Sequence, residues 1–120
     1  MEEVIREVVP KNISDMRVDA DRLIELLNEN KAVLVDVRMP FETAVWGLNF
    51  GLKIPANELP DNLDKLDKEK LIVVACPKND RSIMARTYLA SVGFNVSYLS
   101  CGLLGLLDRL KGGKAKDIKL

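Results

Sequence analysis

The fold is decided by one stretch of the sequence, Leu71-Ile72-Val73-Val74-Ala75-Cys76-Pro77-Lys78-Asn79-Asp80-Arg81-Ser82. Its first five residues are apolar and mostly β-branched, with no polar alternation, which is typical of a strand buried on both faces of a sheet. A polar loop follows at once, and a helix is predicted from about Arg81 to Val92, where Gly93 ends it. A buried strand leading through a short loop into a helix is the repeating unit of α/β proteins.

Strand and helix patterns continue on both sides of this stretch. Strands are predicted over residues 32–37 and 95–99, with an edge piece at 53–55, and helices over 19–30, 41–45, 60–70 and 103–110. Asp19 is a good N-cap for the first of these helices, while Leu63 and Leu66 are the apolar anchors of the helix over 60–70. The alternation predicts an α/β fold with a mainly parallel sheet, in which the runs 33–37 and 71–75 are central and covered by helices on both faces.

The length and composition predict one domain. A chain of 120 residues that is 48% hydrophobic can build one substantial core. Residues 13–110 form the predicted domain, and residues 1–12 form a short, helical lead-in that Pro10 interrupts. The basic tail over residues 111–120 is either a frayed end or a short closing loop.

Composition also excludes several function classes. Eighteen basic and 18 acidic side chains balance, so no nucleic-acid or membrane partner is indicated. The N-terminus lacks the apolar core of a secretory signal, and a cytoplasmic protein is expected. With two cysteines and no histidine, we expect no disulfide scaffold, no metal site and no cofactor. The absence of histidine also excludes a Ser-His-Asp catalytic triad and a Cys-His catalytic pair.

Cys76 is the candidate catalytic residue, because it ends the most apolar strand and precedes a helix. Active sites of open α/β sheets lie beyond the carboxyl ends of the strands. Loop amides and the positive end of the helix would stabilise a thiolate there. Lys78 and Arg81 add positive charge, which Asp80 partly offsets. The alternative is an inert core thiol, but a core cysteine is expected inside the apolar run and not at its polar exit.

At this point the chain resembles a single-domain rhodanese. The first half of the resemblance comprises Val33-Leu34-Val35-Asp36-Val37-Arg38, Pro40, Glu42, Ile54-Pro55 and Glu58-Leu59. The second half comprises Leu71 to Cys76, Arg81-Ser82, Ala85, Leu89, Gly93-Phe94, Val96, Leu99 and Gly102. Each fragment alone is weak, whereas their order and spacing over residues 13–110 are specific.

The resemblance implies a rhodanese-like fold with a five-stranded parallel sheet and a six-residue loop from Cys76 to Arg81. It implies a sulfurtransferase that carries sulfane sulfur as a persulfide on Cys76, from a small anionic donor such as thiosulfate or polysulfide to a thiol or protein acceptor. The donor would be held by Pro77, Lys78, Asn79, Asp80, Arg81 and Ser82. Phosphatases of similar fold have one residue more in this loop, which argues against phosphate as the substrate.

The chain departs from the family pattern at three places. Trp46-Gly47-Leu48 replaces a common Gly-His-Ile, Cys101-Gly102 replaces a pair of glycines, and the loop after Cys76 lacks its usual glycine. These departures argue against efficient thiosulfate turnover. The alternative function is therefore a rhodanese-like module that carries sulfur without turnover, or that only binds a regulatory partner.

Four residues near the predicted site have an alternative structural interpretation. For Asp36 and Arg38 we favour structural roles, in which Asp36 caps loop amides and Arg38 ties two loops together. Trp46 either lines the mouth of a pocket or packs, and packing is the commoner role. Cys101 either resolves the persulfide on Cys76 or is a small residue tolerated at a tight turn, and we favour the second role.

Overall fold

The computed structural model describes residues 1–120 and contains one five-stranded sheet with strand order β1-β5-β4-β2-β3. The strands are β1 (Arg17–Val18), β2 (Ala32–Asp36), β3 (Leu52–Lys53), β4 (Leu71–Ala75) and β5 (Val96–Leu99). Every neighbouring pair is parallel, and the longest register runs from Ala32 opposite Leu71 to Asp36 opposite Ala75. The predicted α/β class is confirmed, and the two apolar runs are interior strands.

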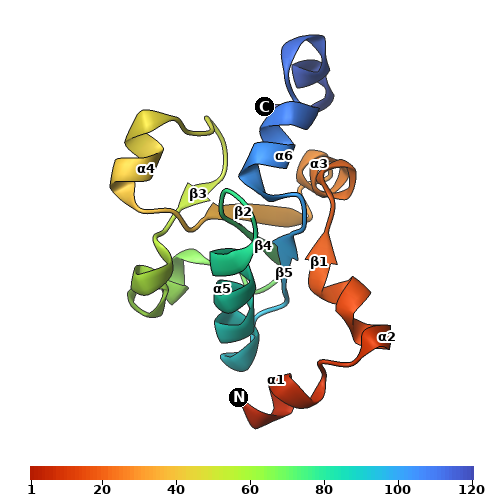
Figure 1. Ribbon diagram of the computed structural model, residues 1–120, viewed down its shortest axis with the longest axis vertical. Coiled ribbons are helices and arrows are strands. Elements are labelled where there is room, and N and C mark those ends of the chain that lie inside the picture. The colour runs from red at the N-terminus through yellow and green to blue at the C-terminus, as the bar shows by residue number, and fades with distance from the viewer.

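Ten helical segments connect and flank these strands (Figure 1). The α-helices are α1 (Glu2–Arg6), α2 (Pro10–Ile13), α3 (Ala20–Asn28), α4 (Pro40–Val45), α5 (Asp80–Ser91) and α6 (Gly102–Arg109). The 3₁₀ helices are η1 (Ser14–Met16), η2 (Ala56–Asp61), η3 (Leu63–Lys65) and η4 (Gly112–Asp117). The Asp19 carboxylate accepts a hydrogen bond of 2.8 Å from the Arg22 amide, as predicted for an N-cap. None of these helices is long and apolar enough to cross a bilayer.

Two apolar cores lie on opposite faces of the sheet, because successive side chains of a strand point to opposite sides. Helix α5 and η2 cover one face, and α3 and α6 lie together over the other (Figure 1). Along β4, Ile72 and Val74 enter the α5 core, whereas Val73 and Ala75 enter the other. Cys76, which follows β4, continues this alternation and faces α5.

The structure differs from the prediction in two segments. The surface helix expected over residues 60–70 is wrong, since that region holds the end of η2 and the short η3. Pro60 has no amide to donate, and Asn62 leaves the helical region at φ −129°, so an α-helix does not propagate. Strand β1 was not predicted, because a two-residue strand is too short to show a periodic pattern.

The chain ends form ordered short elements. The lead-in is helical as expected, and Pro10 occupies the first turn of α2, where its missing amide costs nothing. Of the two interpretations left open for the tail, the structure favours a closing segment. Asn28 of α3 donates to the Asp117 carbonyl at 2.8 Å and accepts from the Lys119 amide at 2.9 Å.

Candidate functional site

Cys76 lies at the carboxyl end of the central strand β4, directly before the loop that leads into α5. Its side chain is completely buried, with a relative exposure of 0%. The Ser82 amide, in the first turn of α5, donates to the Cys76 sulfur at 3.4 Å. The partial positive charge of a helix N-terminus therefore points at this sulfur, as expected from the sequence.

Four consecutive amides that follow Cys76 have no acceptor within the protein: those of Lys78, Asn79, Asp80 and Arg81. The first two lie in the loop, and the other two begin α5, where the amides of a first turn have no intrahelical partner. Such amides can donate to an anion or to a polarised sulfur. The loop thus has four amides free to donate beside the predicted nucleophile, which the anion site expected from the sequence requires.

Helix α6 holds this loop in place. Its Leu103 amide donates to the Cys76 carbonyl at 2.8 Å, and its Leu104 amide donates to the Pro77 carbonyl at 3.3 Å. Because a trans peptide places its N–H opposite its C=O, the Lys78 amide points away from α6. Gly102 allows this close approach: it has φ +69°, and a Cβ atom there would collide with the carbonyl oxygens of Pro77 and Lys78.

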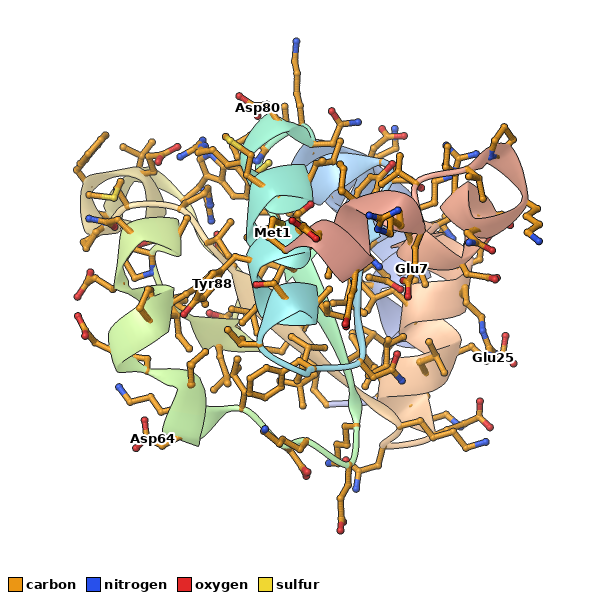
Figure 2. All side chains as sticks on the ribbon, turned by 90° about the horizontal axis from the view of Figure 1, so that it is seen from below. Met1, Glu7, Glu25, Asp64, Asp80 and Tyr88 are labelled. Carbon is orange, nitrogen blue, oxygen red and sulfur yellow. The ribbon has the colours of Figure 1, made fainter.

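Asp80 brings a negative charge to the sulfur. Its Oδ1 atom lies 3.7 Å from the Cys76 sulfur, within reach of the thiol proton. Asp80 is otherwise exposed, at the N-terminal end of α5 (Figure 2). It also lines an open hollow of about 340 Å³ together with the remainder of the loop and Leu104 of α6. The carboxylate is thus positioned between the buried nucleophile and solvent.

Arg81, which also lines the hollow beside the loop, is paired with Glu42. Its two terminal nitrogens donate to the two carboxylate oxygens of Glu42 at 2.6 and 2.9 Å. Glu42 also accepts from the Met39 amide at 3.1 Å, which caps α4. The Arg81 guanidinium and this amide lower the pKa of Glu42 to about 2, so both partners are charged near neutral pH. The pair connects α4 to the first turn of α5.

Asp36 and Arg38 form a buried ion pair, which supports the structural roles favoured above. Arg38 is 1% exposed and donates through two nitrogens to the Asp36 carboxylate, the shorter bond being 2.7 Å. The same carboxylate accepts the Arg38 amide at 3.1 Å. The guanidinium stacks on the Trp46 ring at 3.8 Å from the ring centre, so this tryptophan packs after α4.

Cys101 has neighbours different from those of Cys76. Its sulfur lies beside Asp19 and Ala20 at the start of α3 and against Gly105 of α6, on the face of the sheet opposite α5. Partial burial raises the pKa of the Cys101 thiol. These contacts favour the structural interpretation of Cys101 over the resolving role.

The remaining predicted site residues surround the loop. Pro77 is half-buried against α6, Lys78 and Asn79 are exposed, and Ser82 is buried with its hydroxyl donating to the Asn79 carbonyl at 3.1 Å. Two important residues were not among the predicted site residues. The only sequence signal for Glu42 is the Pro-x-Glu pattern at the start of α4. The only signal for Gly102 is the presence of a glycine where a helix begins.

Comparison with known proteins gives one family. The model of the Rhodanese-like domain matches residues 19–108 of this chain. A protein of Allochromatium vinosum named sulfurtransferase is 30% identical over 78 residues, which cover 64% of this chain and 73% of that protein. The crystal structure of a rhodanese-related protein from Thermoplasma volcanium superposes with a TM-score of 0.69 at 26% identity, covering 78% of this chain and 91% of that one.

A second kind of relative has a different name. A tRNA uridine(34) hydroxylase of Pelagibacter ubique is 31% identical over 117 residues. This match covers 88% of the present chain, whereas the chain spans only 39% of the length of the hydroxylase. The similarity therefore concerns one part of a larger protein.

Proposed function

This chain belongs to the rhodanese-like domain family, and on that premise we propose that it transfers sulfane sulfur through a persulfide on Cys76. The observation that carries the proposal is the position of the Cys76 sulfur. It ends the central strand, accepts the Ser82 amide at 3.4 Å and is followed by four amides without acceptors. These amides can donate to the sulfur atoms of a persulfide in a protein without histidine.

The proposed reaction has two steps. In the first, the Cys76 thiolate attacks the outer sulfur of a polysulfide, persulfide or thiosulfate, and the donor leaves with the electron pair of the broken bond. In the second, an acceptor thiol attacks the outer sulfur of the Cys76 persulfide and releases the cysteine. Splitting one transfer into two displacements is nucleophilic catalysis.

Access to the sulfur requires movement, since Cys76 has no exposed surface in this structure. The loop over residues 77–79 separates Cys76 from the hollow beside α6 and is the segment whose displacement would admit a donor. Both thiols are free, and the proposed cytoplasmic location would keep them reduced.

Intact-protein mass spectrometry after incubation with inorganic polysulfide tests the proposal. The wild-type protein and its matched control Cys101→Ser should gain one sulfur atom that a reductant removes, and Cys76→Ser should gain none. Multiple turnovers after addition of a thiol acceptor would identify an enzyme. Loading with slow or absent turnover would instead identify a sulfur carrier, and equal loading of the Cys76→Ser protein would refute the assignment of Cys76.

The similarity to a tRNA uridine(34) hydroxylase favours a second candidate function, participation in modification of a tRNA uridine. The acidic and basic side chains of this chain balance, so its composition does not indicate an RNA partner, and we rank this candidate second. Nucleoside analysis of tRNA from cells with and without the gene distinguishes the two. A loss of hydroxylated uridine that the Cys76→Ser protein fails to restore would support this second function.

A further inference from the structure

We propose that Asp80 selects the sulfur donor by its charge, favouring organic persulfides whose carbon side is neutral or cationic over thiosulfate and other dianions. The inference rests on the function proposed above and identifies the donor class for the same site. The observation behind it is the carboxylate beside the nucleophile, with Oδ1 of Asp80 3.7 Å from the Cys76 sulfur.

A donor cannot avoid this carboxylate. The outer sulfur of the donor must come into bonding contact with the Cys76 sulfur, so the group attached to that outer sulfur passes close to Asp80. Asp80 also lines the open hollow above the loop, which is the approach from solvent. A sulfonate on the incoming sulfur would meet a like charge there, whereas an ammonium group would meet an opposite one.

The cations nearby do not cancel this negative charge. Arg81 is neutralised by both carboxylate oxygens of Glu42, whose low pKa of about 2 keeps that partner ionised. Arg38 is likewise paired with Asp36. Lys78 is exposed and forms no ion pair, so it is the one unpaired cation in the loop, and water screens its flexible side chain.

The favoured transfer needs no external oxidant or reductant. The Cys76 thiol loses its proton, and its sulfur forms a bond to the outer sulfur of a persulfide R–S–SH. The bond between the two donor sulfurs breaks, and the inner sulfur leaves with the electron pair as R–S⁻. That thiolate takes up one proton, so Cys76 and the persulfide become a Cys76 persulfide and the thiol R–SH.

Two donors of matched length test the charge dependence. 2-Aminoethyl persulfide and 2-carboxyethyl persulfide share a two-carbon spacer and end in an ammonium and a carboxylate group, respectively, and thiosulfate provides the dianion. Loading rates of the wild-type protein are measured by rapid quenching and intact mass at low and high salt. The same rates are measured for Asp80→Asn and for the control Asp64→Asn, which changes the net charge equally from the far end of the molecule (Figure 2).

The wild-type protein should load faster from the amino than from the carboxy donor. Asp80→Asn should lower this ratio by about tenfold or more, because a unit charge within a few ångströms is only partly screened. Asp64→Asn should leave the ratio unchanged, and high salt should reduce it in the wild type. Glu42→Gln, which removes the carboxylate partner of Arg81, should raise the rate with thiosulfate.

Three results would overturn the proposal. If Cys76 loads from both donors with the same ratio in the wild-type and Asp80→Asn proteins, Asp80 does not select donors, while the sulfurtransferase function stands. A preference of the wild-type protein for thiosulfate, lost in Lys78→Gln, would assign selection to the lysine instead. If no donor loads Cys76 in the wild-type protein, the proposed function fails together with this inference.

Discussion

Gly102 gives the sharpest test of how the active-site loop is held. Replacing it with alanine imposes two penalties. A side chain at φ +69° costs about 1–2 kcal/mol, because left-handed backbone crowds a Cβ atom. The new atom would also collide with the carbonyl oxygens of Pro77 and Lys78 and lie 2.8 Å from the Lys78 Cα, and such overpacking costs about 1–3 kcal/mol. We expect a total loss of about 2–5 kcal/mol in the free energy of unfolding.

Gly112 provides a matched control. It also has a left-handed backbone, at φ +60°, but a Cβ atom there would meet nothing within 4 Å. Gly112→Ala should therefore cost about 1–2 kcal/mol through the backbone alone. Urea unfolding followed by the fluorescence of the single tryptophan, Trp46, measures both variants under the same conditions.

The Gly102→Ala substitution should distort the active-site loop more than the rest of the fold. Relief of the collision requires movement of backbone, and the amides of Leu103 and Leu104 would then lose their bonds to the Cys76 and Pro77 carbonyls. In folded Gly102→Ala protein, sulfur loading of Cys76 should be at least about tenfold slower than in Gly112→Ala. Equal stability of the two variants, or equal loading rates, would refute the role assigned to Gly102.

Three further predictions concern other polar groups. Arg38→Met should lower the free energy of unfolding by about 3–5 kcal/mol, because it leaves the Asp36 carboxylate buried without its partner; urea unfolding measures this, and a loss below 1 kcal/mol contradicts it. Glu42→Gln should cost about 1 kcal/mol at pH 7 after allowance for partial exposure. Since folding lowers the pKa of Glu42 to about 2, the Arg81 pair contributes fully above its ordinary pKa and is lost as the pH falls from about 4.5 towards 2, so the difference between the two proteins should shrink there. Cys101 should react more slowly with iodoacetamide at pH 7.5 than an ordinary cysteine, in a protein whose other cysteine is serine, because partial burial raises the pKa of its thiol; rapid labelling at neutral pH would contradict this raised pKa.

The sequence predicted the features that depend on local pattern. The unbroken apolar run from Leu71 to Ala75 predicted a strand buried on both faces, and it is the central strand of the sheet. Asp19 predicted the start of α3, where its carboxylate caps the helix. The order of short motifs along the chain also predicted the family, which the match over residues 19–108 confirms.

The features that were missed depend on contacts between distant segments. Glu42 and Arg81 are 39 positions apart, and nothing in either local pattern shows that they pair. As a result, Arg81 was expected to bind an anionic donor, although its charge is engaged by a carboxylate. Gly102 was recognised as the start of a helix, but its close approach to Lys78 follows only from the packing of α6 on the loop. Long-range packing therefore determines the electrostatics of the site.

The complete burial of Cys76 affects how readily its thiol is oxidised by peroxide. Peroxide converts an accessible thiolate to sulfenic acid and then to sulfinic acid, which most proteins cannot reverse. For Cys76, each encounter with peroxide requires a spontaneous displacement of the loop over residues 77–79, whereas a donor that binds the free amides can hold the displaced loop in place. The covered resting state should therefore protect the Cys76 thiol from peroxide between encounters with the donor of the proposed reaction, which must displace the same loop.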